Sequence, residues 1–511
     1  MRIPLLIVLS WMALMTALSS CEQPSNPVNE GLLTFNSDTV HFDTIFTTLQ
    51  APTERLIVRN EQGRALAIDR IWMENGGNSE FDMIVDGVRT SDTTDLVISQ
   101  KDSMHIFITM KSYERDGFAM DYVNFQIGED IQKVPIMAWI VDAYFLTARV
   151  TQGEDFLGLK PGSFFFRQDT TLTPEKPIIF DGPIFIPEGV TVTVEPGTQL
   201  HFTPYKFGIE DTSGQQVFGF FSSLFVDGTL VAEGTPSMPI KFQGTRFDTL
   251  YQELPAQWRG LFFHPTSRDS KLEHCVIQNA QFGVKVDSSS VNLNPKLIIR
   301  NTEIKNMGVY GFFAVNVSEN VSPDRPTVLM ENSIINTCKD RTVAISGGGS
   351  YEFNNCTFAN FNLGDIRFSR RTPQIIASNW YTFDGANFFV YPSYVSFNNC
   401  VIWGSEDNEI IQDTLIGYPF DELVFDHCIV KLDEDNEPFI RPHLVNCRVN
   451  EDPKFWNYFV RDYRPADSTS PVINAGKDIP GIELDFRGLA EFSRTDTLDI
   501  GAFEYYLIEE E

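Results

Sequence analysis

Positive charge is scarce in this chain. Its 511 residues hold 39 Lys and Arg against 69 Asp and Glu, a formal net charge of −30. A nucleic-acid partner is excluded because binding phosphates requires clustered Lys and Arg. A basic patch that adheres to anionic lipid headgroups is excluded for the same reason. The acidic surplus predicts a solvated, self-repelling surface. Calcium binding is the alternative role for acidic residues, but the sequence contains no Asp-rich calcium loop.

Several catalytic motifs are also missing. The sequence has no Gly-rich phosphate loop, no G-x-S-x-G elbow, no H-E-x-x-H pair and no C-x-x-C pair. We therefore expect no cofactor and no metal. The four segments typical of pectin-cleaving hydrolases, N-T-D, D-D, G-H-G and R-I-K, are absent as well.

Long apolar runs are absent after the first twenty residues. Arg2 and the apolar stretch 3–18 form a signal peptide over 1–20, and no later run reaches the ~18 residues of a spanning helix. The stretch "LSSC" (18–21) resembles a bacterial lipobox, which implies cleavage before Cys21 and lipid attachment to its sulfur. The alternative is an uncleaved anchor. We expect an outer-membrane lipoprotein facing the cell surface or the periplasm, joined to its folded part by a flexible tether over 21–31.

Helical periodicity is lacking throughout, so the prediction is an all-β protein. Residues 32–147 alternate apolar and polar in seven or eight short bursts that turn residues separate, which predicts a β-sandwich. The stretches "NGGNSEFDMIVDG" and "ISQKDSMHIFITM" resemble successive strands of the Ig-like modules found near the N-terminus of Bacteroidota lipoproteins.

Residues 148–455 carry a repeat of roughly 20–30 residues made of short β-runs, which predicts a solenoid. A small residue recurs in it, preceded by Asn or His, at Cys275, Thr302, Ser333, Cys356, Cys400, Cys428 and Cys447. A right-handed parallel β-helix of the pectin-lyase-like type fits, because equivalent residues of successive coils then stack at about 4.8 Å. We expect the small residues to form one inward column of reduced thiols and hydroxyls. The Asn and His residues should form a second column whose amides bond from coil to coil.

The interval between Cys356 and Cys400 is too long for one coil. It hides either a coil without the small residue or a protruding loop. This insert is rich in aromatic residues, on which sugars stack, so the candidate ligand-binding residues are Trp380, Tyr381, Tyr391 and Tyr394. The alternative is a loop that folds back over the solenoid.

The C-terminal stretches "SPVINAGKD" (470–478), "LDFRG" (484–488) and "DTLDIGAFEY" (496–505) resemble the C-terminal region of bacterial surface β-helix proteins labelled choice-of-anchor Q. The resemblance covers roughly 175–505 and implies a cap over 456–511. In it, Asp485, Arg487, Asp499 and Glu504 are expected to form an ion-paired closure over the last coil.

These features favour a lipid-anchored cell-envelope protein whose β-helix is a non-catalytic binding or structural scaffold. Its expected partners are the membrane, reached through the lipid, and a polysaccharide or another envelope protein. The alternative is a polysaccharide lyase or glycoside hydrolase, for which the best cluster is Asp365, Arg367 and Arg370. An enzyme should show two carboxylates, or a carboxylate with Arg or Lys, converging in an open groove beside the aromatic insert.

Overall fold

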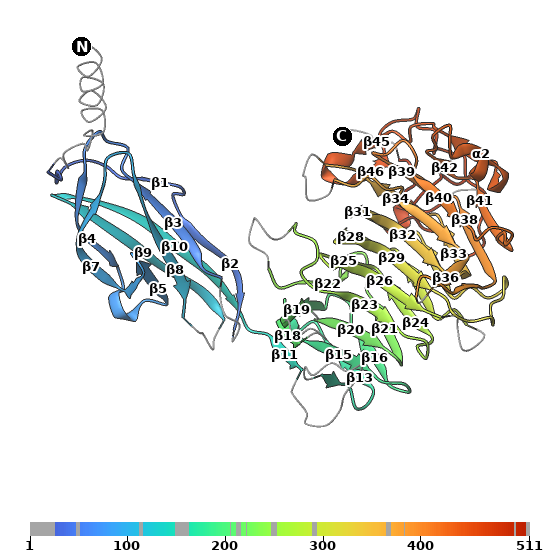
Figure 1. Cartoon of the computed structure of the whole chain (residues 1–511), viewed down its shortest axis with the longest axis horizontal. Helices are drawn as coiled ribbons and strands as arrows, with labels where there is room; N and C mark the ends of the chain where they lie inside the picture. Colours follow the sequence, from blue (N-terminus) through green and yellow to red (C-terminus); the bar gives the residue numbers. More distant parts are fainter. Residues whose placement is uncertain are drawn as a thin grey trace, which may run out of the picture. The chain divides into compact units, whose positions relative to one another are not determined.

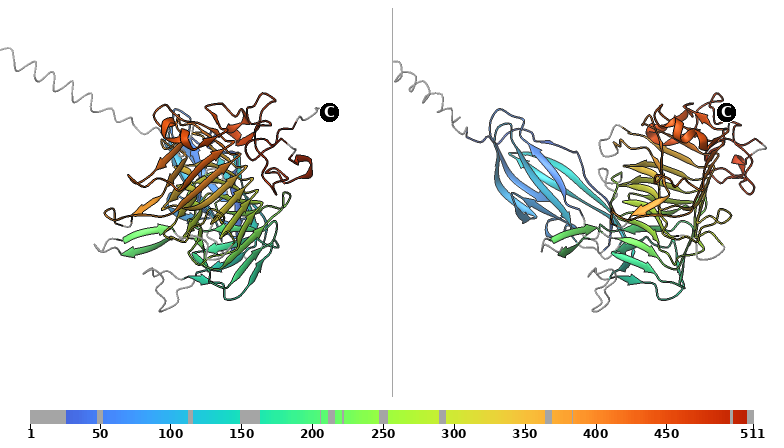
Figure 2. Two further views of the ribbon diagram at one scale, coloured as in Figure 1. Left: turned by 90° about the vertical axis from the view of Figure 1, so that its right-hand side faces the viewer. Right: turned by 45° about the vertical axis from the view of Figure 1, so that its right-hand side comes forward.

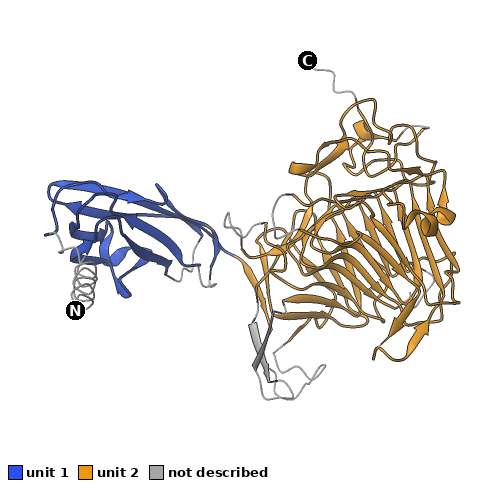
Figure 3. Cartoon of the chain, turned by 45° about the horizontal axis from the view of Figure 1, so that its top comes forward, with its two compact units in different colours: residues 1–142 blue, residues 143–511 orange. Residues whose placement is uncertain are grey.

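The computed structural model describes residues 26–47, 52–111, 116–148, 163–204, 206–210, 216–220, 222–246, 253–288, 294–363, 369–382, 384–494 and 497–506. The chain divides into two compact units, 1–142 and 143–511 (Figure 3). The sequence places this boundary at 147/148. No described helix is both long enough and apolar enough to cross a membrane.

The first unit is a β-sandwich of two five-stranded sheets. One sheet has the order β1-β3-β8-β5-β6 and the other β2-β10-β9-β4-β7. Their bounds are β1 Thr34–Phe35, β2 Val40–Phe46, β3 Glu54–Arg59, β4 Leu66–Met73, β5 Phe81–Val85, β6 Val88–Thr90, β7 Asp92–Ile98, β8 Ser103–Met110, β9 Gly117–Ile127 and β10 Asp130–Val141, with the 3-10 turn η1 Gly76–Asn78.

Period-two alternation builds this sandwich, as the sequence predicts. In β4, for example, Leu66 and Ile68 are fully buried while Ala67 between them is not. The two sheets share one apolar core that includes Phe42, Phe81 and Phe125. The two-sheet arrangement is therefore confirmed, and its Ig-like character stays a prediction.

The second unit is a parallel β-helix of three long sheets (Figure 1). The eleven-stranded sheet contains β11 Tyr144–Thr147, β14 Ile178–Asp181, β17 Gln199–Phe202, β22 Ile240–Gly244, β25 Cys275–Gln278, β28 Glu303–Met307, β31 Ile334–Cys338, β34 Thr357–Asn360, β39 Val401–Gly404, β42 Ile429–Val430 and β44 Arg448–Val449.

The other two sheets complete each coil. The nine-stranded sheet contains β12 Phe164–Phe165, β15 Pro183–Ile186, β20 Ser223–Val226, β23 Gly260–Phe263, β26 Phe282–Asp287, β29 Tyr310–Val315, β32 Arg341–Ser346, β35 Ile375–Ser378 and β40 Ile410–Asp413. The ten-stranded sheet contains β13 Thr170–Leu172, β16 Thr191–Val194, β21 Thr229–Glu233, β24 Ser270–Glu273, β27 Leu297–Arg300, β30 Val328–Glu331, β33 Gly349–Asn354, β38 Ser393–Asn398, β41 Glu422–Asp426 and β43 Leu444–Val445.

Smaller elements lie outside these sheets. They are the two-stranded pairs β18 Lys206–Glu210 with β19 Gln216–Phe220, β36 Trp380–Thr382 with β37 Phe388–Val390, and β45 Phe455–Asn457 with β46 Asp462–Pro465, and the helical turns α2 Glu437–Ile440, η3 Arg441–His443, η4 Tyr458–Val460 and η5 Ala490–Phe492.

The predicted column of small residues is confirmed. The backbone N–H of Cys275 donates to Thr302 Oγ1 at 3.2 Å, and that of Thr302 donates to Ser333 Oγ at 3.2 Å. Farther along, the N–H of Cys400 donates to Cys428 Sγ at 3.3 Å. The described cysteines are free thiols; Cys447, in the last coil, is half-buried and the others are buried. The side chains thus tie each coil to the next without a disulfide.

The residue that precedes each small residue turns the chain by adopting the left-handed backbone conformation. His274, Asn301, Asn332, Asn355, Asn399, His427 and Asn446 have φ between 46° and 52°. Asn adopts this region more readily than most residues. The predicted coil-to-coil amide column is wrong apart from one long contact, Asn399 to Asn355 at 3.5 Å. The amides of Asn301, Asn332 and Asn399 face the C-terminal segment instead, because that segment lies beside the corner.

This corner is tight, whereas the other two corners carry insertions. Between the ten- and eleven-stranded sheets only one or two residues separate the strands from β24 onward. The insert between Cys356 and Cys400 holds one coil, because β34 pairs directly with β39 and β35 pairs with β32 and β40. Part of its extra length lies between β34 and β35, and the rest forms the hairpin β36–β37 between β35 and β38. The protruding-loop alternative is therefore correct.

The C-terminal segment does not close the last coil, so that prediction is wrong. Residues 470–494 and 497–506, here called the strap, run along the flank of the β-helix. Asn301 Nδ2 donates to Asp485 O at 2.8 Å, and Asn399 Nδ2 donates to Lys477 O at 2.7 Å. Asn332 Nδ2 donates to Leu484 O at 2.8 Å between them. In Figure 2 the red strap lies beside the orange coils.

Apolar packing explains this position. The outer faces of β31, β34, β39 and β42 present Ile334, Ala359, Val401 and Ile429, and the C-terminal residues Tyr463, Val472, Ile500 and Ala502 bury them. The expected ion pairs form partly. Arg487 contacts Asp485 at 2.5 Å, but Glu504 pairs with Arg494 at 2.6 Å. Asp499 accepts the backbone N–H of Asn474 at 2.7 Å. The cluster thus fastens the strap to the side of the solenoid.

Candidate binding surface

The hairpin β36–β37 stands on a base of three glycines. Gly347 N–H donates to Trp380 O at 3.0 Å, and Gly349 N–H donates to Pro392 O at 2.8 Å. Gly348 has φ +76°, and a Cβ there would lie 2.6 Å from Pro392 O and 2.7 Å from Tyr391 O. The stretch 347–349 therefore lets both ends of the hairpin approach the coil below.

The tip of the hairpin is also held. Asp384 accepts the backbone N–H groups of Ala386 at 2.9 Å and Asn387 at 2.8 Å. These bonds hold the pKa of the Asp384 carboxyl at about 2, so it is ionised at neutral pH. Gly385, with φ +70°, completes the turn.

A second loop joins the hairpin from the next coil. Asn379 Nδ2 donates to Tyr418 O at 2.8 Å and to Pro419 O at 3.1 Å. The two loops expose Phe388 by 48%, Phe389 by 43%, Ile416 by 97% and Tyr418 by 55%. Trp380 lies edge-on to Phe388 at 5.4 Å. We call Trp380, Tyr381, Phe388, Phe389, Ile416 and Tyr418 the aromatic patch; Phe388 and Phe389 occupy opposite faces of the hairpin, because successive side chains of a strand alternate.

The structure brings three of the four predicted ligand-binding residues together. Trp380 and Tyr381 are in β36, and Tyr391 N–H bonds to Asn379 O at the foot of the hairpin. Tyr394 lies in β38, where it is aligned with Ser350 and Glu422, outside the hairpin. Sequence reasoning missed Ile416 and Tyr418, which carry no local signal, and it missed the three consecutive glycines, which do.

The predicted catalytic cluster is not an open acid–base site in the described residues. Asp365 and Arg367 lie outside them, as does Cys21. Arg370 pairs with Glu409 at 2.6 Å, and their side chains are 1% and 0% exposed. Burial raises the pKa of Glu409 against the pull of Arg370. Arg370 also donates to Asn360 O and Thr372 O, so the pair braces the insert from inside.

An outer column of rings on the nine-stranded sheet offers a second aromatic surface. Phe165, Phe185, Phe225 and Phe262 are in register on successive coils. The first three stack face to face, at 4.9 Å and 17° and then at 4.7 Å and 18°. Each ring therefore covers its neighbour's face, and little more than ring edges is left for solvent. A sugar packs on a ring face, so this column suits stacking between coils rather than binding.

Charged side chains border that column. His264 Nδ1 lies 3.0 Å from Asp227 Oδ1, and Lys285 Nζ lies 2.6 Å from Asp287 Oδ1. Lys296 donates to the carbonyls of His264, Pro265 and Asp287, and burial lowers its pKa to about 8. Each of these carboxylates already has a cationic or imidazole partner within the protein.

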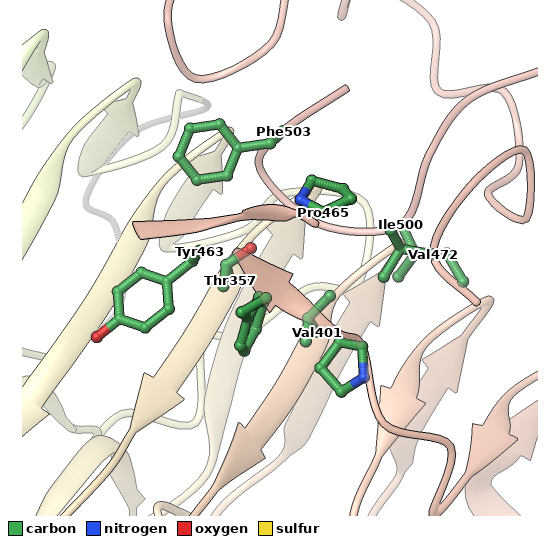
Figure 4. Close-up of a pocket in the computed structure, with 9 residues that line it drawn as sticks. Thr357, Val401, Tyr463, Pro465, Val472, Ile500 and Phe503 are labelled. Carbon is green, nitrogen blue, oxygen red and sulfur yellow. The ribbon is translucent and has the colours of Figure 1, made fainter. Parts of the chain in front are cut away.

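The described residues hold no cluster of three or more His, Cys, Asp or Glu side chains suited to a metal ion. Beneath the strap lies a cavity of about 10 Å³ lined by Thr357, Val401, Tyr463 and Phe503 among others (Figure 4). That is room for at most one water, so the strap packs closely on the sheet.

Comparisons with known proteins give no family. No protein-family model and no curated protein matches the chain. Among solved structures, the Escherichia coli chaperone DraB shows 13% identity and a TM-score of 0.15, over 21% of this chain and 54% of the chaperone; the chain thus spans about half its length. A family 123 glycoside hydrolase from Clostridium perfringens shows 5% identity and a TM-score of 0.16, over 51% of this chain and 70% of the hydrolase.

Proposed function

We propose that this protein is a lipid-anchored component of the bacterial cell envelope whose β-helix is a non-catalytic scaffold and whose aromatic patch binds glycans. The exposure of the patch carries the proposal. Four large apolar side chains, each more than 40% exposed, stand on two loops that hydrogen bonds and close glycine packing hold in place. Exposed apolar clusters on rigid loops are typical of binding surfaces.

The positions and hydrogen-bond partners of the charged side chains favour binding over catalysis. A lyase or hydrolase needs carboxylates, or a carboxylate with Arg or Lys, that the polymer can reach beside the patch. Arg370 and Glu409 are sealed inside the coil. Two of the exposed carboxylates beside the patch, Asp384 and Asp421, accept hydrogen bonds from backbone N–H groups. The aromatic patch therefore supports recognition of a sugar surface more directly than cleavage of a bond.

A glycan array followed by affinity electrophoresis tests the binding function. The double variant Phe388→Ala/Phe389→Ala should weaken binding of any retained polysaccharide at least tenfold, the loss typical of two hot-spot aromatics. Phe439→Ala/Phe459→Ala is the matched control, because those rings are 70% and 65% exposed outside the patch. Binding that the control abolishes equally would contradict the proposal.

Two further assays address the anchor and the alternative activity. Cys21→Ser should release the protein from the membrane fraction and abolish its metabolic labelling with a fatty-acid analogue. Assays for reducing ends and for unsaturated products should detect no turnover. Turnover of any polysaccharide that is lost in Arg367→Ala would instead establish the lyase or hydrolase alternative.

A further inference from the structure

The aromatic patch lies in a part of the chain without positive side chains. Residues 372–430 contain no Lys or Arg. Both loops of the patch fall within this run, together with β35, β38, β39, β40 and β41. Recognition of a carboxylated or sulfated sugar requires Lys or Arg near the ligand, because charge-assisted hydrogen bonds to guanidinium or ammonium groups supply the affinity for such anions.

The cations that flank this run in the sequence do not serve the patch. Arg370 is buried against Glu409, and Lys431 Nζ donates to Gly404 O and lies 5.5 Å from the Trp403 ring. Arg371 precedes β35, whereas the hairpin follows it. Four residues of strand span about 13 Å. That length exceeds the Debye length of about 8 Å at physiological ionic strength.

Carboxylates border the same loops instead. Asp384 caps the hairpin tip, Asp421 accepts the N–H of Ser393 at 2.9 Å, and Glu422 begins β41; all three residues are exposed. An ionised carboxylate accepts hydrogen bonds from sugar hydroxyls and repels anionic groups. Aromatic surface with acceptor groups at its border is the chemistry that suits uncharged sugars.

We infer that the ligand of the aromatic patch is a neutral glycan and that uronate-containing and sulfated glycans are excluded. This inference rests on the proposed function and narrows it to one substrate class. The exposed rings supply the stacking, and the carboxylates at the border of a run without Lys or Arg supply the selectivity.

Affinity electrophoresis of the full chain at physiological salt tests it with defined polymers. Xyloglucan, galactomannan and mixed-linkage glucan represent neutral glycans, and polygalacturonate, alginate and chondroitin sulfate represent acidic ones. We expect retardation by at least one neutral polymer, a loss of at least tenfold in Phe388→Ala/Phe389→Ala, and no retardation by the acidic set.

A charge swap at one exposed position provides the matched pair. Ile416 is 97% exposed, so Ile416→Lys and Ile416→Glu should fold alike, which circular dichroism checks. The lysine variant should gain weak binding to the acidic polymers that disappears at high salt, and the glutamate variant should not.

The outcomes separate the two claims. Binding of an acidic polymer by the unaltered chain, lost in the double phenylalanine variant, would overturn the inference and leave glycan binding standing. No binding to either class, or capture of an envelope protein through the same residues, would overturn both.

Discussion

At the scale of single residues, one Asn in each of several coils performs two tasks. It adopts the left-handed backbone that the tight corner requires, and its amide bonds to a strap that arrives from a distant part of the sequence. Asn399 shows both, with φ +51°, Nδ2 donating to Lys477 O, and Oδ1 accepting the Lys477 N–H at 2.8 Å. A local conformational preference thus also determines where the C-terminal segment docks.

Replacing Asn399 separates these tasks. Asn399→Gly keeps the backbone conformation and loses the bonds to the strap, at a cost of about 1–2 kcal/mol in the free energy of unfolding. Asn399→Ala should cost about 1 kcal/mol more, because alanine is strained in the left-handed region. Urea unfolding of the two variants measures the difference. Equal stability of the two variants would show that the corner imposes no backbone strain.

Glu504 predicts a pH dependence of stability. Burial, assisted by Asp499 and Asp485 and opposed by Arg494, raises its pKa from 4.5 to about 7. The folded state therefore binds an additional proton between these values, and its stability should fall as pH rises from about 4.5 to about 7. The loss should be on the order of 3 kcal/mol. Urea unfolding across this range should show a flatter profile for Glu504→Gln, and identical profiles would refute the assignment.

The residue scale also shows what sequence can predict. Cys, Thr and Ser at the same position of successive repeats predict an inward column, because stacked coils place equivalent residues together. The partners of Asn301 and Asn399 could not be predicted in the same way. They lie 184 and 78 residues further along the chain, outside any repeat.

At the scale of elements, the hairpin β36–β37 depends on the glycines beneath it. The aromatic composition of the insert made it a candidate in the sequence, but the contribution of the loop containing Ile416 and Tyr418 follows from coil stacking that the local sequence does not encode. Likewise, the flank position of the strap depends on apolar outer faces at Ile334 and Val401, which read as ordinary strand residues.

Gly348→Ala should displace the hairpin. The added Cβ would lie within 2.7 Å of two carbonyl oxygens, so the foot of the hairpin must shift, and glycan binding should fall severalfold. Gly385→Ala is the control, because it has a similar φ and nothing within 4 Å of the new atom. Affinity electrophoresis compares them; a larger loss in the control would mean that the tip rather than the foot sets the geometry.

At the scale of the whole molecule, the two units have separate cores. The sandwich core contains Phe81 and the β-helix core contains Phe353, and neither cluster includes residues of the other unit. Each unit therefore has its own source of stability, as expected for domains of this size.

Calorimetry should resolve this independence. Phe81→Ala removes a buried ring at a cost of about 3–5 kcal/mol and should lower the melting temperature of one transition only. Phe353→Ala should lower the other. A single transition that both substitutions shift equally would show that the units unfold as one cooperative body.

The run without Lys or Arg has a practical consequence for mapping. Trypsin cleaves only after those two residues, so digestion should release 372–431 as one uninterrupted peptide that carries every ring of the aromatic patch. Photo-crosslinking to a sugar probe followed by mass spectrometry would then place the whole recognition surface in a single fragment.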